Sequence, residues 1–250
     1  MKHVYDYAIV GGGLAGASAV EGIRELDETG KILLVSDENH LPYDRPPLSK
    51  KLWFGKKKVE EIFLHDRAFY DKHGVTLALG AKVARLDSDA RTLTTAHGET
   101  YGFGKLLLAT GCKPRTLTIP GGDLDGICYF RNLDDYLRTR SVAAEGKSAV
   151  VVGGGFIGSE LAAALNICKV QVTMIFPSEL LCDRVLPDYL GRAVQQRYAE
   201  KGVRVLASDK PVSFSKNAVI YIDPNIPDRV LATVSASHVD ASRGYPQLGM

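Results

Sequence analysis

Two glycine-rich segments have the composition and spacing of dinucleotide-binding loops. Residues 11–16 read GGGLAG after the apolar run 7–10, and residues 153–158 read GGGFIG after the apolar run 149–152. In such loops the first glycine permits a tight turn, the second lets the backbone approach a pyrophosphate, and the third lets helix and strand pack closely. The helix that follows offers free N–H groups to the phosphates. Two copies about 140 residues apart predict two dinucleotides, and their usual chemistry is electron transfer from a nicotinamide to a flavin.

The elements that must position these loops are two strand–helix–strand units. Apolar runs with buried-strand character precede each loop, and apolar residues at helical spacing follow it. A right-handed parallel crossover is expected for each unit. The expected strand, helix and strand cover residues 4–10, 14–28 and 31–36 in the first unit and 148–152, 156–166 and 170–176 in the second.

Further elements complete an α/β fold. Short alternating runs within residues 75–108 predict a small antiparallel meander, and residues 105–109 a buried strand. A helix over residues 188–201 is expected to place Leu190, Val194 and Tyr198 on one face and to end at Gly202, before a strand over residues 203–206. The predicted fold is therefore two Rossmann-like FAD/NAD(P)-binding three-layer units with parallel sheets and a small antiparallel meander.

Composition limits the classes of function. The 250 residues are 45% apolar and 24% charged with a net charge of +2, which is typical of a soluble globular protein and gives no electrostatic case for nucleic acid or a membrane. No signal peptide is evident, and His65 and His73 show no metal-ligand spacing. The absence of CxxC or CxxxxC argues against a redox-active disulfide or a zinc site and favours reduced thiols in the cytoplasm. The cysteines are Cys112, Cys128, Cys168 and Cys182.

A more specific signal is the segment 41–50, LPYDRPPLSK. With the two glycine loops, ATG at 109–111 and PR at 114–115, it resembles the FAD-dependent pyridine nucleotide-disulfide oxidoreductases. The nearest branch contains the ferredoxin and rubredoxin reductases and apoptosis-inducing factor. Residues 153–160 and 184–190 look most like apoptosis-inducing factor and its bacterial relatives, and the resemblance covers about residues 4–210.

The resemblance implies an FAD site built largely from the first unit. Asp37 and Glu38 lie 21 and 22 residues after Gly16, the distance at which a carboxylate reaches a ribose hydroxyl. By resemblance, Lys50 lies beside the isoalloxazine, where it stabilises negative charge on reduction, and pairs with Glu160. The expected FAD-binding residues are Gly11, Gly13, Leu14, Ala15, Gly16, Asp37, Glu38, Arg45, Lys50, Val83, Ala109, Thr110, Gly111 and Arg131.

The second loop is expected to bind NADH or NADPH. Phe156 is placed where the nicotinamide stacks, so that Lys50, Glu160 and Phe156 form the expected catalytic group. No acid ends the second strand of this unit: Glu179 would still reach a ribose, whereas Ser178 with Arg184 would favour a 2′-phosphate. The choice between NADH and NADPH therefore stays open, and the family resemblance favours NADH. The expected nucleotide-binding residues are Gly153, Gly154, Gly155, Phe156, Ile157, Gly158, Glu160, Ser178, Glu179 and Arg184.

The implied activity passes a hydride from nicotinamide to flavin and then electrons to a ferredoxin, rubredoxin or quinone. The oligomeric state stays open, with a homodimer as one alternative. The expected domains are 1–120 for FAD, 121–222 for NAD(P)H, and an atypical tail over 223–250. Residues 211–250 lack the returning strand and Gly-Asp motif of the family, which suggests a truncation, a frame change or a divergent substitute. The alternative function is therefore a truncated, catalytically weak dinucleotide-binding or partner-binding module. A flavin monooxygenase does not explain segment 41–50.

Overall fold

The computed structural model describes residues 3–215, 218–222 and 230–235. The chain divides into two compact units. Unit 1 contains residues 1–47 and 57–113, and unit 2 contains residues 48–56 and 114–250. Much of the expected atypical tail, residues 223–229 and 236–250, lies outside the described residues. Within the described ranges, no helix combines the length and the hydropathy needed to cross a bilayer.

Unit 1 is built on one mixed sheet with the strand order β3-β2-β1-β6-β5-β4. The strands β3, β2, β1 and β6 are parallel, whereas β5 and β4 extend the sheet in antiparallel register. Their bounds are β1 (His3–Val10), β2 (Ile32–Val35), β3 (Val75–Ala78), β4 (Val83–Asp87), β5 (Thr92–Thr95) and β6 (Thr100–Leu108).

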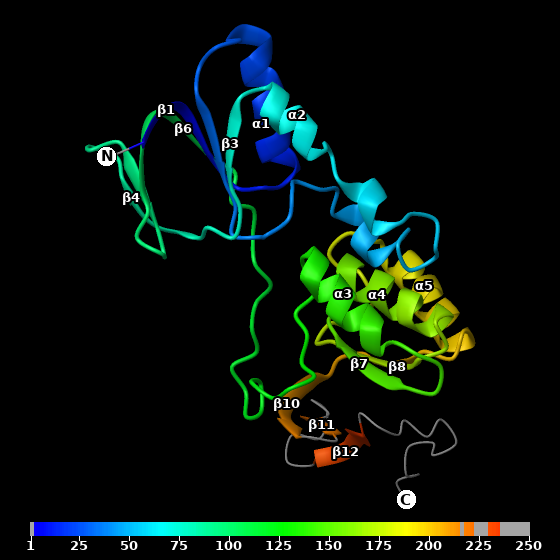
Figure 1. Cartoon of the computed structure of the whole chain (residues 1–250). Coiled ribbons are helices and arrows are strands. Elements are labelled where there is room, and N and C mark those ends of the chain that lie inside the picture. The colour runs from blue at the N-terminus through cyan, green and yellow to red at the C-terminus, as the bar shows by residue number, and fades with distance from the viewer. Residues whose placement is uncertain (1–2, 216–217, 223–229, 236–250) are drawn as a thin grey trace, which may run out of the picture. The chain divides into compact units, whose positions relative to one another are not determined.

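The strand β2 and the last residues of β1 are buried on both faces. On one face Ile9 and Leu34 pack with Val20 of α1 (Leu14–Leu26) and Tyr70 of α2 (Arg67–Lys72), and both helices lie beside the sheet in Figure 1. On the other face Ala8, Val10, Leu33 and Val35 pack with Leu93 of β5 and Phe103 of β6. The antiparallel strands thus close the face that the helices leave open. The short turns η1 (Pro46–Ser49) and η2 (Val59–Ile62) complete the helical elements up to residue 113.

The end of α1 is fixed by Asp27. Its Oδ1 accepts the backbone N–H groups of Gly30 (2.8 Å) and Thr29 (3.0 Å), and its Oδ2 accepts the hydroxyl of Tyr7 (3.0 Å). These hydrogen bonds, that from Gly30 first, lower the pKa of Asp27. Arg24 donates to carbonyls at the end of α1, the start of β2 and the end of α2, so this corner joins three elements.

Unit 2 repeats the design with a parallel sheet of order β7-β8-β9 and a separate antiparallel sheet of order β10-β11-β12. Helix α4 packs on β7 and β8, and α5 packs on β9 (Figure 1). The bounds are α3 (Leu133–Val142), β7 (Ser148–Val152), α4 (Phe156–Ile167), β8 (Gln171–Ile175), α5 (Asp188–Glu200), β9 (Arg204–Leu206), β10 (Lys210–Ser215), β11 (Ala218–Ile222) and β12 (Val230–Ser235).

Residues 48–56 belong to unit 2 although unit 1 surrounds them in the sequence. Leu52 and Trp53 are buried there. The indole N–H of Trp53 donates to the carbonyl of Leu48 (2.7 Å), and its ring meets Tyr136 of α3 edge-on, with centroids 5.5 Å apart. Tyr136 in turn donates its hydroxyl to the carbonyl of Leu52 (3.4 Å). Aromatic packing therefore anchors this short segment against α3.

The structure confirms the predicted α/β fold and corrects two details. Residues 75–78 were expected in the antiparallel meander, but β3 pairs with β2 in parallel, because α2 provides the crossover that a parallel pair requires. Residues 105–109 were expected to be buried, but Leu107 and Leu108 are 42% and 58% exposed. Residues 105–108 of β6 pair with β1 on one side. In the described structure, β5 pairs only with residues 100–102 of β6 and so leaves the other side of residues 105–108 without a strand.

Candidate functional site

The loop of unit 1 turns sharply at Gly11, which has φ 130°. Its N–H donates to the carbonyl of Val35 (2.8 Å), and a Cβ there would lie 2.1 Å from the carbonyl oxygen of Ala109. A Cβ on Gly16 would lie 2.0 Å from the carbonyl oxygen of Gly11. These two glycines are therefore required by the fold itself, and they place the loop against the end of β6.

Gly13 is different, because the described structure does not explain its lack of a side chain. It is the N-cap of α1 with φ −100° and ψ −169°, and no described side chain caps the helix. A Cβ on Gly13 would meet no described atom within 4 Å. The next residues, Leu14 and Ala15, are exposed. An uncapped helix N-terminus behind an open backbone surface fits a pyrophosphate.

The loop of unit 2 has the same construction. Gly153 has φ 130°, and a Cβ on Gly158 would lie 2.1 Å from its carbonyl oxygen. Gly155 is the N-cap of α4, has no side-chain cap among the described residues and would carry a Cβ in open space. A Cβ on Gly154 would lie 2.6 Å from the ring of Phe176. Each unit thus holds one pair of glycines that the fold requires and one glycine at the helix N-cap whose Cβ would meet no described atom within 4 Å.

A carboxylate follows β2 in a fixed position. One oxygen of Glu38 accepts the hydroxyl of Tyr43, which is buried, and the other accepts the guanidinium of Arg45. Burial alone would lower the pKa of Arg45, but the hydrogen bond to Glu38 and the neighbouring negative groups raise it above its ordinary value. Asp37 is more exposed, 3.8 Å from the ammonium of Lys113. Glu38 is therefore the better oriented of the two predicted ribose ligands.

The predicted Lys50–Glu160 pair is present within unit 2. The Nζ of Lys50 lies 2.7 Å from Oε2 of Glu160 in α4, and the hydroxyl of Ser49 donates to the same oxygen at 2.6 Å. The side chain of Lys50 is 47% exposed and that of Glu160 is 25% exposed. The carboxylate thus fixes an ammonium group that remains accessible on one side.

Phe156 and Ile157 begin α4 and are 57% and 49% exposed. They directly follow Gly155, so an apolar surface lies next to the uncapped N-terminus of this helix. A planar, partly apolar ring joined to a pyrophosphate would meet both features.

The segment after β8 carries the remaining predicted nucleotide ligands. Ser178 donates its hydroxyl to the carbonyl of Leu180 (3.2 Å). Glu179 is exposed and forms an ion pair with Arg192 of α5 (3.0 Å). Arg184 is exposed and forms no ion pair within the described ranges. The three residues therefore lie on one loop, but the structure does not join them to one another.

Other predicted cofactor ligands have local structural roles. Val83 pairs with Thr95 between β4 and β5, and the N–H of Arg131 donates to Asp135 in the capping box of α3 (2.9 Å). Thr110 and Gly111 are exposed after β6. Their contacts with a cofactor stay predictions.

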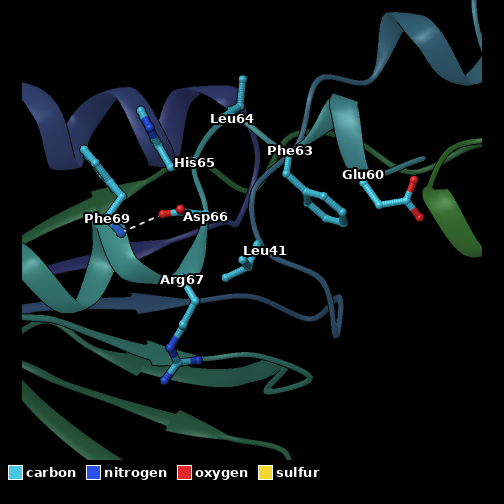
Figure 2. Close-up of a pocket in the computed structure, with 8 residues that line it drawn as sticks. All are labelled: Leu41, Glu60, Phe63, Leu64, His65, Asp66, Arg67 and Phe69. Carbon is cyan, nitrogen blue, oxygen red and sulfur yellow. Dashed lines mark hydrogen bonds between the residues drawn. The ribbon is translucent and has the colours of Figure 1, made fainter. Parts of the chain in front are cut away.

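Unit 1 has a cavity of about 510 Å³ whose lining contains none of the predicted site residues. Figure 2 shows its lining, in which the N–H of Phe69 donates to Asp66. His65 stacks on Phe69 at 3.7 Å and contacts Glu21 at 2.7 Å. Among the described residues, no cluster of three His, Cys, Asp or Glu side chains could hold a metal ion. The cavity is lined by Leu41, Glu60, Phe63, Leu64, His65, Asp66, Arg67 and Phe69.

Sequence reasoning missed Tyr43 and Ser49 as site residues. Both lie in the segment 41–50 that was singled out, and each orients a predicted carboxylate, Glu38 or Glu160. Their spacing from Arg45 and Lys50 in that segment is the only signal that could have found them.

Comparison with known proteins agrees with this geometry. The family model described as pyridine nucleotide-disulphide oxidoreductase matches residues 5–235. The chain is 38% identical over 205 residues to the 5,5′-dehydrodivanillate O-demethylase ferredoxin reductase subunit of Sphingobium sp., covering 82% of this chain and 50% of that protein. It is 34% identical over 239 residues to the putative apoptosis-inducing factor 1 of Drosophila melanogaster, covering 82% and 32%.

Among solved structures, the chain is similar to that of the covalent putidaredoxin reductase–putidaredoxin complex, with a TM-score of 0.82 and 29% identity. That match covers 88% of this chain and 55% of the other. The chain thus spans half or less of the length of these two relatives. The expected resemblance is confirmed: the chain belongs to the pyridine nucleotide-disulphide oxidoreductase family.

Proposed function

We propose that this chain forms the nucleotide-binding part of an FAD-dependent NAD(P)H oxidoreductase. The observation that carries the proposal is a pair of helix N-termini that no described side chain caps, each behind a glycine whose Cβ would meet no described atom. When bound, FAD supplies the means to accept a hydride from a nicotinamide and to release electrons singly to an acceptor.

In unit 1, the N–H groups at the start of α1 bind the FAD pyrophosphate. Gly13 lets the phosphates approach the backbone, and Glu38 accepts hydrogen bonds from the ribose. Tyr43 and Arg45 support this role, because they hold both oxygens of Glu38 in place before any ligand arrives. Preorganised acceptors lose less conformational entropy on binding.

In unit 2, the N–H groups at the start of α4 bind the pyrophosphate of the nicotinamide nucleotide. Gly155 provides the close approach, and Phe156 offers an exposed aromatic face for the nicotinamide. We assign Ser178, Glu179 and Arg184 to the ribose end because they follow β8, the second strand of the unit.

Lys50 supplies a fixed positive charge for the redox centre. Oε2 of Glu160 accepts the ammonium of Lys50 at 2.7 Å, and the hydroxyl of Ser49 donates to the same oxygen at 2.6 Å and so orients the carboxylate. An oriented cation stabilises negative charge that develops during a reaction, and it does so without reorganising. We therefore assign Lys50 and Glu160 to charge stabilisation during hydride transfer.

We further propose that the electron acceptor is a ferredoxin or a rubredoxin, with a quinone as the small-molecule alternative. Similar proteins support this assignment, since one is named as a ferredoxin reductase subunit and another was crystallised with putidaredoxin. We also propose the cytoplasm as the location, since none of the four cysteines lies in a CxxC or CxxxxC pattern.

An anaerobic visible absorption spectrum tests the proposal. The purified chain would be mixed with FAD, desalted, and titrated with NADH and with NADPH. A flavin band that survives desalting and bleaches with either nucleotide is the expected result. A protein that desalts colourless would reject the FAD site in this chain, and a yellow protein that neither nucleotide bleaches would reject the nucleotide reductase.

A further inference from the structure

The two units share one hydrogen-bond scheme around their glycine loops. In unit 1 the N–H of Gly11 donates to the carbonyl of Val35, the last residue of β2, at 2.8 Å. In unit 2 the N–H of Gly153 donates to the carbonyl of Ile175, the last residue of β8, at 2.9 Å. Val35 and Ile175 are therefore equivalent positions.

The equivalence continues into the loops that follow. The N–H of Ser36 donates to the carbonyl of Ala78 at the end of β3 (2.9 Å), and the N–H of Phe176 donates to the carbonyl of Leu206 at the end of β9 (3.2 Å). Each residue comes directly after its strand, and each side chain occupies the space beside the middle glycine of its GGG run.

Two residues further on, the scheme pairs Glu38 with Ser178. The carbonyl of Glu38 accepts the N–H of Gly80 (3.0 Å), and the carbonyl of Ser178 accepts the N–H of Ser208 (2.9 Å). The backbone at the two positions is thus held alike, but one unit presents a carboxylate and the other a hydroxyl.

This replacement changes which ribose the site accepts. A carboxylate at this position accepts hydrogen bonds from ribose hydroxyls and repels a 2′-phosphate, whereas a nearby arginine accommodates the phosphate. Ser178 carries no charge, and its hydroxyl, which now donates to Leu180 at 3.2 Å, can turn to donate to a phosphate oxygen.

The charged groups of the same loop are compatible with a phosphate. The N–H of Cys182 donates to the carbonyl of Gly154 (2.8 Å), which holds this loop beside the glycine loop. Two residues later Arg184 is exposed, with no ion pair in the described part of the chain. Glu179 is engaged by Arg192 at 3.0 Å, which leaves Asp183 as the loop's other exposed carboxylate.

We infer that the dinucleotide site of unit 2 accepts a 2′-phosphorylated nicotinamide nucleotide, NADPH, because Ser178 stands where a ribose-binding carboxylate would exclude it. Arg184 is the cation for the 2′-phosphate. This inference rests on the proposed function, in which unit 2 binds a nicotinamide nucleotide, and it departs from the NADH that the family resemblance favours.

Isothermal titration of the full chain with NAD⁺ and NADP⁺, in the presence of excess FAD, tests the inference without turnover. We expect NADP⁺ to bind at least as tightly as NAD⁺. Ser178→Glu should weaken NADP⁺ binding by about tenfold or more, since a charged group replaces a favourable contact, and should leave NAD⁺ binding equal or tighter.

Arg184→Gln should weaken NADP⁺ binding selectively. Arg197→Gln, which removes an exposed arginine of α5 that pairs with Glu200, is the matched control and should change neither nucleotide. The coenzyme inference alone would be overturned if the wild-type chain bound NADP⁺ more than about tenfold more weakly than NAD⁺. It would also be overturned if Ser178→Glu left the ratio of the NAD⁺ and NADP⁺ affinities unchanged.

The proposed function fails in a different way. If neither nucleotide binds, or if binding of both is unaffected by Gly155→Ala, then unit 2 is not the nicotinamide nucleotide site. Gly155→Ala is suited to this control because a Cβ there meets no described atom within 4 Å.

Discussion

The ammonium of Lys50 lies 2.7 Å from Oε2 of Glu160, although 110 residues separate the two in the sequence. Ser49 donates to the same oxygen. We expect Lys50→Ala to slow flavin reduction by NAD(P)H by about tenfold or more, because a preorganised charge is lost, and to weaken FAD retention less. Stopped-flow absorbance measures the first and equilibrium dialysis the second. Lys51→Ala, one residue away and exposed, is the control, and equal losses in both measurements would mean that Lys50 is only structural.

The glycines of each loop should separate into two classes on substitution. Gly13→Ala and Gly155→Ala should keep the fold, with at most about 1 kcal/mol lost at the helix cap, and should weaken dinucleotide binding about tenfold to hundredfold through overpacking. Gly16→Ala should unfold more readily, because its Cβ would lie 2.0 Å from a backbone oxygen. Urea denaturation and FAD or NADP⁺ titration distinguish the classes; a Gly13→Ala protein with unchanged FAD affinity would contradict the proposed pyrophosphate site.

Glu38 should contribute more to FAD binding than Asp37. Both oxygens of Glu38 are oriented by Tyr43 and Arg45, whereas the side chain of Asp37 is 51% exposed. We expect flavin content after desalting to fall in the order wild type, Asp37→Ala, Glu38→Ala, with Tyr43→Phe between wild type and Glu38→Ala. Changing both acids together should lower flavin content furthest, and unchanged content in that double variant would reject the ribose assignment.

Asp27 should make the stability of unit 1 depend on acid pH. Hydrogen bonds, that from Gly30 first, lower its pKa below the ordinary value of 3.8. A carboxyl with a lowered pKa in the folded state stabilises the protein above its unfolded pKa, and this stability disappears as the pH falls through the folded value. Between about pH 5 and pH 2, wild type should therefore lose more stability than Asp27→Asn. Urea midpoints measure this, and Glu28→Gln, the adjacent exposed carboxylate, should follow wild type.

Tyr70 is buried with a hydroxyl that has no hydrogen-bond partner in the described structure. Burial, with a smaller effect from Glu21, raises its pKa to about 12. Because an unsatisfied buried hydroxyl is costly, Tyr70→Phe should stabilise the protein by about 1 kcal/mol. Tyr136→Phe, which removes a hydroxyl that donates to Leu52, should not stabilise it. A lower thermal midpoint for Tyr70→Phe would show that the hydroxyl has a partner after all.

The sequence predicted the fold best where the local residue pattern alone determines the element that forms. The two strand–helix–strand units were predictable because glycine spacing, apolar strands and helical periodicity all agree around residues 4–36 and 148–176. Gly202, with φ 85°, ends the turn after α5 as expected. The resemblance carried by residues 41–50 identified Lys50 and Glu160 as a pair, which spacing alone would not do.

The parts that were missed depend on long-range contacts. Helix α3 has a weak apolar pattern, and its burial comes from Leu133 and Tyr136, the latter against Trp53. The strands β11 and β12 pair with each other and with β10, but their sequence shows no family motif. The hydrogen bond from Tyr43 to Glu38 spans five residues of an irregular loop, whose backbone geometry no periodicity describes.

The placement of residues 48–56 within unit 2 constrains how this architecture can be dissected or recombined. A fragment that starts at residue 114 would leave an uncovered hollow where Leu52 and Trp53 are buried, and it would deprive Glu160 of its cation. No single cut in the polypeptide yields two self-sufficient halves. A nucleotide-binding module made from the second half would therefore need residues 48–56 to be grafted onto it.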